Sequence, residues 1–429
     1  MKKTLIIPLH ALFLILCSKF CSSQIKMDFA ADKILNDNIC TVQLYVEPLV
    51  LSDPVIGLNG PSQLHLEFDD LQGEKKNYFY TVIQCNYDWT PSELSTFDYL
   101  TGFSEQEIRD YQISFGTDQT YIHYSALFPK ADFRITKSGN YILKVFEEEN
   151  PEQIILTRSF IVIDNKLQIT SDINQADDVR YNRTHQQVNF TIEHRGMNIS
   201  NGFSEVKVLL LQNFRWDNVI TDLQPQFVRP DQLDYTHSAK TSFPAGKEFR
   251  YFDTRTLRYK SDRVKAIEEN KNETIITLLP DQSRGNAQSF SRKDINGKFI
   301  PGTQDYSDED SRAEYLWVRF SLPVDYPFRN GKIFLLSKFT DWQLKDSHRL
   351  QYNAASDTYE VSVYLKQGYY EYLYYFSTDE KPEGEDSFDL LEGNSYETEN
   401  SYQILVYYHP FGTRYDQVIG YKSTDTFNR

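Results

Sequence analysis

Histidines are the side chains in this sequence best suited to bind metals or to move protons near neutral pH. Beyond the first 23 residues they occur singly, on segments with strand or loop patterns, at His65, His123, His185, His194, His237, His348 and His409. None belongs to a His-Glu-x-x-His or another metal-binding motif. We therefore expect ordinary surface or core histidines, and no metal site.

Other signatures of catalysis are also missing from the sequence. It has no Gly-rich phosphate loop, no Gly-x-Ser-x-Gly and no Cys-x-x-Cys. Nothing singles out one carboxylate pair for glycoside hydrolysis among the 61 acidic residues. The sequence predicts a protein that is not an enzyme and needs no cofactor. A hydrolase, the alternative, would require a cleft lined by carboxylates with perturbed pKa values.

An acidic run from Asp305 to Asp310 offers the oxygen ligands that calcium prefers. Its spacing does not match a helix–loop–helix calcium site, and no glycine stands at the turn position. We expect a solvated linker.

Cys40 and Cys85 are the two cysteines beyond residue 23. In an oxidising compartment they could form one disulfide bond, although one bond is not a disulfide framework. The simpler interpretation is two buried thiols that pack as small apolar side chains.

A segment rich in aromatic residues follows Cys85 and is the most distinctive part of the chain. It contains five candidates for partner binding: Tyr87, Trp89, Phe97, Tyr99 and Phe103. Such a segment can be a long connection packed by its own rings. It can equally be an exposed contact surface with aromatic anchors for another protein.

The first 23 residues have the layout of a secretory signal peptide. Lys2 and Lys3 precede an apolar run from Thr4 to Leu16, and cleavage is expected before Gln24. The sequence Leu14-Ile15-Leu16-Cys17 offers a lipoprotein alternative. It is disfavoured because Leu16 stands where Gly, Ala or Ser is usual. No later apolar run approaches the roughly 20 residues of a spanning helix, so we expect no direct membrane insertion.

The formal charge of the chain is −16, with 45 basic and 61 acidic residues. Such a surface repels phosphate backbones and anionic head groups, which argues against nucleic-acid binding and membrane-surface binding.

Alternating apolar and polar residues recur along the whole chain, as in Leu64, Leu66 and Phe68, and turn residues separate these segments. The pattern predicts a mostly β protein of tandem immunoglobulin-like β-sandwich domains. The expected boundaries are 1–23 for the signal peptide, 24–165, 166–300 and 301–429. Two short helices are expected, at 104–111 and 262–270.

The last third resembles the starch- and glycogen-binding immunoglobulin-like modules. The resemblance rests on Lys338-Phe339-Thr340-Asp341-Trp342 and on the pattern Gly368-x-Tyr370-x-Tyr372. It implies a sandwich fold, and it provides an alternative function, carbohydrate binding in the periplasm or at the cell surface.

The N-terminal third carries a more specific resemblance, in motifs that occur in a fixed order: Leu66-Glu67-Phe68-Asp69-Asp70-Leu71, Gln84-Cys85-Asn86-Tyr87-Asp88-Trp89, Tyr99-Leu100-x-Gly102-Phe103, Tyr121-x-His123-Tyr124, Lys137-Ser138-Gly139-Asn140-Tyr141 and Arg158-Ser159-Phe160. The chain resembles the plug proteins of the Bacteroidota type IX secretion translocon. Ser159 departs from the pattern, which has paired arginines before the aromatic residue.

This resemblance implies a periplasmic protein at the periplasmic face of the outer membrane. Its partner would be the giant outer-membrane β-barrel translocon protein, whose periplasmic mouth it would seal when no cargo passes. The resemblance implies no catalytic residues.

Overall fold

The computed structural model describes residues 31–148, 150–271, 273–289, 292–307, 309–328, 330–378 and 388–426. The expected signal peptide, 1–23, lies outside these residues. Regular structure in the described residues is almost entirely β-strand, arranged in several sheets, which confirms the predicted mostly β sandwich class. Its immunoglobulin-like detail stays a prediction.

The first unit, here called the N-terminal sandwich, consists of two sheets and a two-stranded ladder. One sheet contains β1 (Lys33–Ile34), β12 (Asn150–Ile163), β11 (Gly139–Glu147), β5 (Tyr78–Cys85), β7 (Gln106–Ile108) and β3 (Val55–Gly57). The other contains β2 (Ile39–Val46), β4 (Leu64–Asp70), β9 (Ile122–Phe128) and β8 (Asp110–Ile113). The ladder joins β6 (Leu100–Gly102), which follows helix α1 (Thr96–Tyr99), to β10 (Phe133–Ile135).

Strand β4 shows why these segments form a sandwich. Leu64, Leu66 and Phe68 point into one core with aromatic rings of the facing sheet, such as Tyr78 and Tyr80. The alternate residues of β4 lie on its opposite face, because successive side chains of a strand point to opposite sides.

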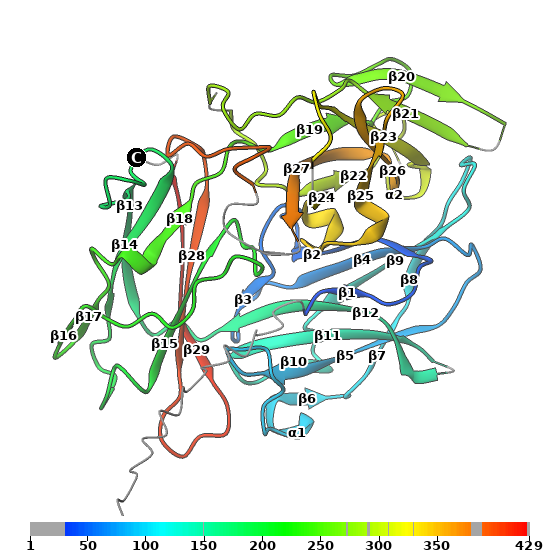
Figure 1. Cartoon of the computed structure of the whole chain (residues 1–429). Coiled ribbons are helices and arrows are strands. Elements are labelled where there is room, and N and C mark those ends of the chain that lie inside the picture. Colours follow the sequence, from blue (N-terminus) through cyan, green and yellow to red (C-terminus); the bar gives the residue numbers. More distant parts are fainter. Residues whose placement is uncertain are drawn as a thin grey trace, which may run out of the picture.

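A second unit, the middle sandwich, also has two sheets. One contains β13 (Gln168–Gln175), β14 (His185–Glu193), β17 (Gln232–Asp234), β16 (Phe227–Arg229) and β18 (Ser242–Pro244), which follows the short helix η1 (Ala239–Thr241). The other contains β15 (Val206–Gln212), β28 (Ser401–Tyr408) and β29 (Gln417–Asp425). Figure 1 shows the two red C-terminal strands beside the green β15.

Between β18 and β28 the chain forms a third unit, here called the inserted unit. Its strands are β19 (Arg250–Asp253), β20 (Val264–Glu269), β21 (Thr274–Leu278), β22 (Phe299–Pro301), β23 (Tyr315–Pro323), β24 (Gly331–Leu336), β25 (Arg349–Asn353), β26 (Thr358–Lys366) and β27 (Gly368–Thr378). Its helices are α2 (Glu309–Arg312), η2 (Lys338–Thr340) and η3 (Asp346–His348). Phe252, Phe320, Tyr370 and Tyr372 meet in its core.

The strand pairing does not follow the boundary expected at residue 300. Strands β19 to β22 belong to the inserted unit, and β28 and β29 return to the middle sandwich. The polar stretch that suggested the boundary is bound within the fold. Asp305 accepts hydrogen bonds from the Thr256 hydroxyl (2.8 Å) and the Leu257 N–H (3.1 Å). The Asp310 main-chain oxygen accepts from Tyr121 and Lys366. The run is therefore attached to the fold at both ends, through the Asp305 side chain and the Asp310 main chain, while the Asp310 side chain stays exposed as expected.

Both expected short helices are wrong. The first segment forms β7 and the edge strand β8, and the second forms β20, which pairs with β21. Pairing with adjacent strands determined these conformations, since local propensity in such short segments is weak. Among the described residues, no helix has the length and apolar character needed to cross a membrane.

Candidate protein-binding surface

The turn after β5 places Trp89 inside the molecule. The Trp89 N–H donates to the Asn86 oxygen (3.0 Å), and the Asn86 N–H donates to the Thr90 oxygen (2.8 Å). Trp89 has a positive φ of 63°, which is strained for a bulky residue. Its ring packs edge to face on Trp216 of the middle sandwich, with centroids 4.9 Å apart. Burial in this contact compensates the strain, and Trp89 joins two units of the fold.

Tyr87 also contacts the middle sandwich. The Lys207 ammonium lies 3.7 Å from the centroid of its ring, and Tyr407 packs edge-on at 6.3 Å. The Tyr87 N–H donates to the Asp416 carboxylate (3.1 Å). Tyr87 is thus occupied by contacts between the two sandwiches.

The remaining three predicted residues separate into one core residue and two surface residues. Tyr99 is buried, packs against Tyr141, and donates its hydroxyl to the Val82 oxygen (3.1 Å). In contrast, 91% of Phe97 and 66% of Phe103 are exposed.

Local hydrogen bonds and backbone contacts hold these two rings outward. The Asp98 carboxylate accepts from the Ser95 N–H (2.8 Å) and hydroxyl (2.9 Å), which fixes the start of α1 beneath Phe97. Before Phe103, Gly102 has a φ of +103°, and a Cβ there would lie 2.0 Å from the Asp132 oxygen. Only glycine permits this close approach of β6 to β10.

The loop between β28 and β29 joins this end of the N-terminal sandwich. Arg414 forms an ion pair with Asp98 (3.3 Å), and the His409 N–H donates to the Glu205 oxygen (2.8 Å). Figure 1 shows this red loop at the same end of the molecule as α1. Phe411 of this loop is fully exposed, and Phe203, two residues before Glu205, is also exposed.

We name Phe97, Phe103, Phe203 and Phe411 the aromatic end surface. Single exposed apolar residues are normal, but four aromatic rings on four connections at one end resemble the anchors of a protein interface. Sequence reasoning missed Phe203 and Phe411. The triplet Pro410-Phe411-Gly412 was a usable signal, because a ring between two turn residues is rarely in a core.

Both cysteines are free thiols in the structure. Cys40 lies on β2 and Cys85 at the end of β5, in different sheets of the N-terminal sandwich. Burial raises the pKa of each thiol to about 12, and nearby aspartates such as Asp69 and Asp88 contribute. Both are therefore protonated and unreactive near neutral pH.

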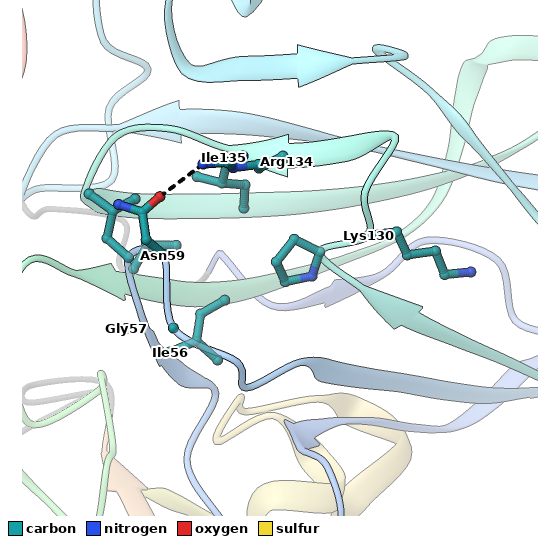
Figure 2. Close-up of a pocket in the computed structure, with 10 residues that line it drawn as sticks. Ile56, Gly57, Asn59, Lys130, Arg134 and Ile135 are labelled. Atoms are coloured by element: carbon teal, nitrogen blue, oxygen red, sulfur yellow. Dashed lines mark hydrogen bonds between the residues drawn. The ribbon is translucent and has the colours of Figure 1, made fainter.

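Two surface hollows among the described residues are large enough to hold a small ligand. The first, of about 220 Å³, has Ile56, Asn59, Lys130 and Arg134 in its lining, and Arg134 donates to Asn59 (3.4 Å) (Figure 2). Neither carboxylate nor imidazole, thiol or hydroxyl side chains line it. Lys130 is the one lining side chain that could act as an acid, base or nucleophile, and the hollow's lining offers it no carboxylate or imidazole partner.

The second hollow, of about 600 Å³, lies where the three units meet and contains Asp294 and Glu399. Burial raises the pKa of both carboxyl groups. Asp294, however, accepts N–H bonds from Phe249 (2.7 Å) and Asn296 (2.9 Å). A carboxylate that accepts two backbone N–H bonds fixes the backbone of a loop. This structural role accounts for the burial of Asp294 without a catalytic function.

Near this hollow, Glu371 has its pKa raised from 4.5 to about 8 by burial and by Asp294. The folded chain therefore keeps this proton at higher pH than the unfolded chain. The stability it contributes is complete below about pH 4.5 and is lost as pH rises toward about 8.

We expect Glu371→Gln to lessen the fall in unfolding free energy between about pH 5 and about pH 8. Glutamine keeps an oxygen for the Ile295 and Gly297 N–H groups but does not ionise. Urea unfolding at both pH values measures the effect, with Glu268→Gln on exposed β20 as the control. An unchanged pH dependence in Glu371→Gln would contradict the prediction.

The fold and the aromatic end surface define a class: an almost entirely β protein of three joined units with exposed aromatic rings at one end. Residues 39–164 match the family model described as the type 9 secretion system plug protein, first domain. The chain belongs to the type 9 secretion system plug protein family. This confirms the resemblance found in the sequence.

A solved structure is similar to the chain over nearly its whole length. The crystal structure of a hypothetical protein from Parabacteroides merdae ATCC 43184 is 34% identical, with a TM-score of 0.88. The alignment covers 92% of this chain and 99% of that one. The collagen adhesin (CNA) of S. aureus aligns over 90% of this chain and 94% of its own, but with 8% identity and a TM-score of 0.09, so it carries no argument. No curated protein matches the chain. The comparisons give no support to the carbohydrate-binding alternative.

Proposed function

We propose that this protein is a periplasmic plug that binds the giant outer-membrane barrel of the type IX translocon and seals its periplasmic mouth. Membership of the plug family supports this role. The role requires binding and shape but no chemistry, which agrees with an assignment as a structural, non-enzymatic component. A location in the periplasm at the outer membrane is part of the same proposal.

The joined architecture suits a stopper. The N-terminal and middle sandwiches share an apolar cluster that includes Trp89, Ile161, Leu211 and Tyr407. Lys298 of the inserted unit pairs with Asp53 of the N-terminal sandwich (2.8 Å). Contacts between all units keep their relative positions fixed, so the chain can oppose the barrel as one body.

The observation that carries the proposal is the aromatic end surface in a chain of this family. Phe97 precedes Asp98 in the chain, and Asp98 pairs with Arg414 of the loop that carries Phe411 (3.3 Å). Aromatic anchors provide binding energy, and surrounding charges favour an interface that can dissociate when cargo arrives.

We expect the triple variant Phe97→Glu, Phe103→Glu and Phe411→Glu to lose about 100-fold or more in affinity for the translocon barrel. The substitutions remove three anchors and place charges where an apolar contact would form. Affinity capture from mild-detergent envelope extracts, with quantified barrel recovery, measures the loss. The control carries glutamate at Phe227 and Tyr326, which are exposed on other parts of the molecule.

Sealing is measured separately, as entry of a large hydrophilic antibiotic into cells that lack the chain. Increased entry supports the stopper, and complementation with the triple variant should fail to restore the barrier. If the triple variant bound the barrel with the affinity of the unmodified chain, the aromatic end surface would not be the surface that contacts the barrel. If the unmodified chain did not bind the barrel, the plug function itself would be overturned.

A further inference from the structure

The outward face of β4 carries a row of ionisable residues, His65, Glu67 and Asp69, which alternate with its core residues. His123 of β9 stands directly opposite Asp69 in the strand register. The inserted unit covers this face. Tyr315 donates its hydroxyl to Asp69 (2.7 Å), and Tyr121 donates to main-chain oxygens of Asp310 and Ala313 (2.8 Å each).

Three of these side chains converge across the two units. Single ligand atoms of Glu67, His123 and Asp310 all lie within 4.8 Å of one another. The His123 Nε2 atom is 3.8 Å from a Glu67 oxygen. Ligands on a tetrahedral zinc ion, with bonds of about 2.0–2.1 Å, lie roughly 3.4 Å apart, so small side-chain rotations would close the site.

In His123 and in the neighbouring His65, a carboxylate contacts the Nδ1 atom and thereby orients the Nε2 atom of the same ring toward Glu67. His123 Nδ1 lies 2.8 Å from Asp69 Oδ1, which places Nε2 toward Glu67. The same arrangement recurs beside the site, where His65 Nδ1 lies 2.9 Å from Glu47 and its Nε2 lies 3.7 Å from Glu67. A carboxylate behind a histidine is the usual support of a metal-binding imidazole, because it fixes the ring and its tautomer.

The charges around the group favour a dication. Lys366 lies 2.8 Å from Asp69, so these two buried charges balance each other. Among the described residues, Glu67 forms ion pairs only with His65 and His123, and Asp310 forms none. Among the described residues, neither carboxylate has a lysine or arginine ion-pair partner, and the Asp310 side chain is open to solvent, so a divalent cation could enter and neutralise both.

We propose that Glu67, His123 and Asp310 form a zinc-class metal site that ties α2 of the inserted unit to the N-terminal sandwich. One nitrogen and two oxygen ligands favour a first-row transition ion over calcium or magnesium, which prefer oxygen alone. Three protein ligands leave a fourth position for water. Metal binding would stabilise the contact between the N-terminal sandwich, which holds the plug-family match at 39–164, and the inserted unit.

Without metal, a proton on His123 can perform part of the same role. Burial alone would lower the pKa of His123, but hydrogen bonds to Asp69 and Glu67 raise it to about 9. An imidazolium between two carboxylates holds the strands together, yet it leaves Asp310 without a cation. The experiment must therefore separate a metal clamp from a proton.

The test titrates Zn²⁺ into the metal-free exported chain by isothermal titration calorimetry. We expect one Zn²⁺ per chain, and about tenfold weaker binding or worse in Asp310→Asn and in Glu67→Gln. Zn²⁺ should raise the Tm of the unmodified chain, and EDTA should reverse the rise. Asp310→Asn keeps the main-chain contacts of Asp310 and should fold normally.

The matched control is Asp172→Asn, an exposed aspartate on β13, whose Zn²⁺ affinity should equal that of the unmodified chain. Absence of Zn²⁺ binding, or equal affinity in Asp310→Asn, Glu67→Gln and the control, would overturn the site. Equal affinity for Mg²⁺ or Ca²⁺ would overturn its zinc-like class. Either failure leaves the proposed plug function untouched, because that function rests on the aromatic end surface.

Discussion

Arg250→Met lowers the free energy of unfolding by about 3–5 kcal/mol, because it removes the buried cation that two buried carboxylates share. The Arg250 side chain is buried and lies 3.0 Å from both Asp281 and Glu392. It also donates to the Gln282 oxygen (2.7 Å). Methionine has a similar length but restores none of these bonds.

Neighbouring contacts decide the size of this effect. Asp281 also accepts the hydroxyls of Tyr372 (2.7 Å) and Tyr374 (2.9 Å), so its position is fixed in the core of the inserted unit. Arg263 and Arg284 still reach the two carboxylates from the partly exposed side. We therefore expect a loss toward the lower end of the range.

Urea unfolding followed by circular dichroism measures this loss. Arg109→Met is the control, since Arg109 pairs with Glu107 at the surface and such pairs contribute about 0–1 kcal/mol. If Arg250→Met cost no more than the control, Asp281 and Glu392 would not be held by Arg250.

Trp89→Ala lowers the free energy of unfolding by about 3–5 kcal/mol through loss of a buried ring. The lost contact with Trp216 joins the N-terminal sandwich to the middle sandwich. We therefore also expect faster proteolysis of the connection between them. Alanine keeps the strained φ at this position, whereas Trp89→Gly relieves it and should be about 1 kcal/mol less destabilising than alanine.

Denaturant unfolding and limited trypsin digestion of the native variants measure these two effects. Trp317→Ala is the matched control, because Trp317 on β23 is 37% exposed and its loss should cost less. A Trp89→Ala chain as stable and as protease-resistant as the control would show that Trp89 does not join the sandwiches.

The sequence predicted the strand content and the aromatic segment but not the role of each ring. Alternation along β4 follows from local sequence, so the sandwich class could be predicted. Trp89 and Phe97 look alike in sequence, yet one is buried and the other exposed. Trp89 is buried because Trp216, in another unit, covers it, and no local pattern records such a partner.

For the same reason, the proposed metal site could not be predicted from the sequence. Glu67 and His123 lie on adjacent strands of the N-terminal sandwich, whereas Asp310 belongs to the inserted unit. Short-range motifs cannot detect ligands brought together by packing between units. The position of Glu67 on an outward strand face could be predicted, but the unit that covers this face could not.

The insertion of one unit into the middle sandwich has a consequence for the order of folding. Strand β15 is synthesised long before β28, its partner in the sheet, and the hydrogen-bonded residues Gln212 and Tyr402 are 190 positions apart. The N-terminal sandwich contains all its strands and can fold early, but β15 must wait for the end of the chain. During this interval its apolar residues, such as Leu210, are open to aggregation or to a chaperone. A chain interrupted before residue 401 would keep its N-terminal sandwich and lose the middle one, so ribosomal arrest or truncation should separate the two in solubility.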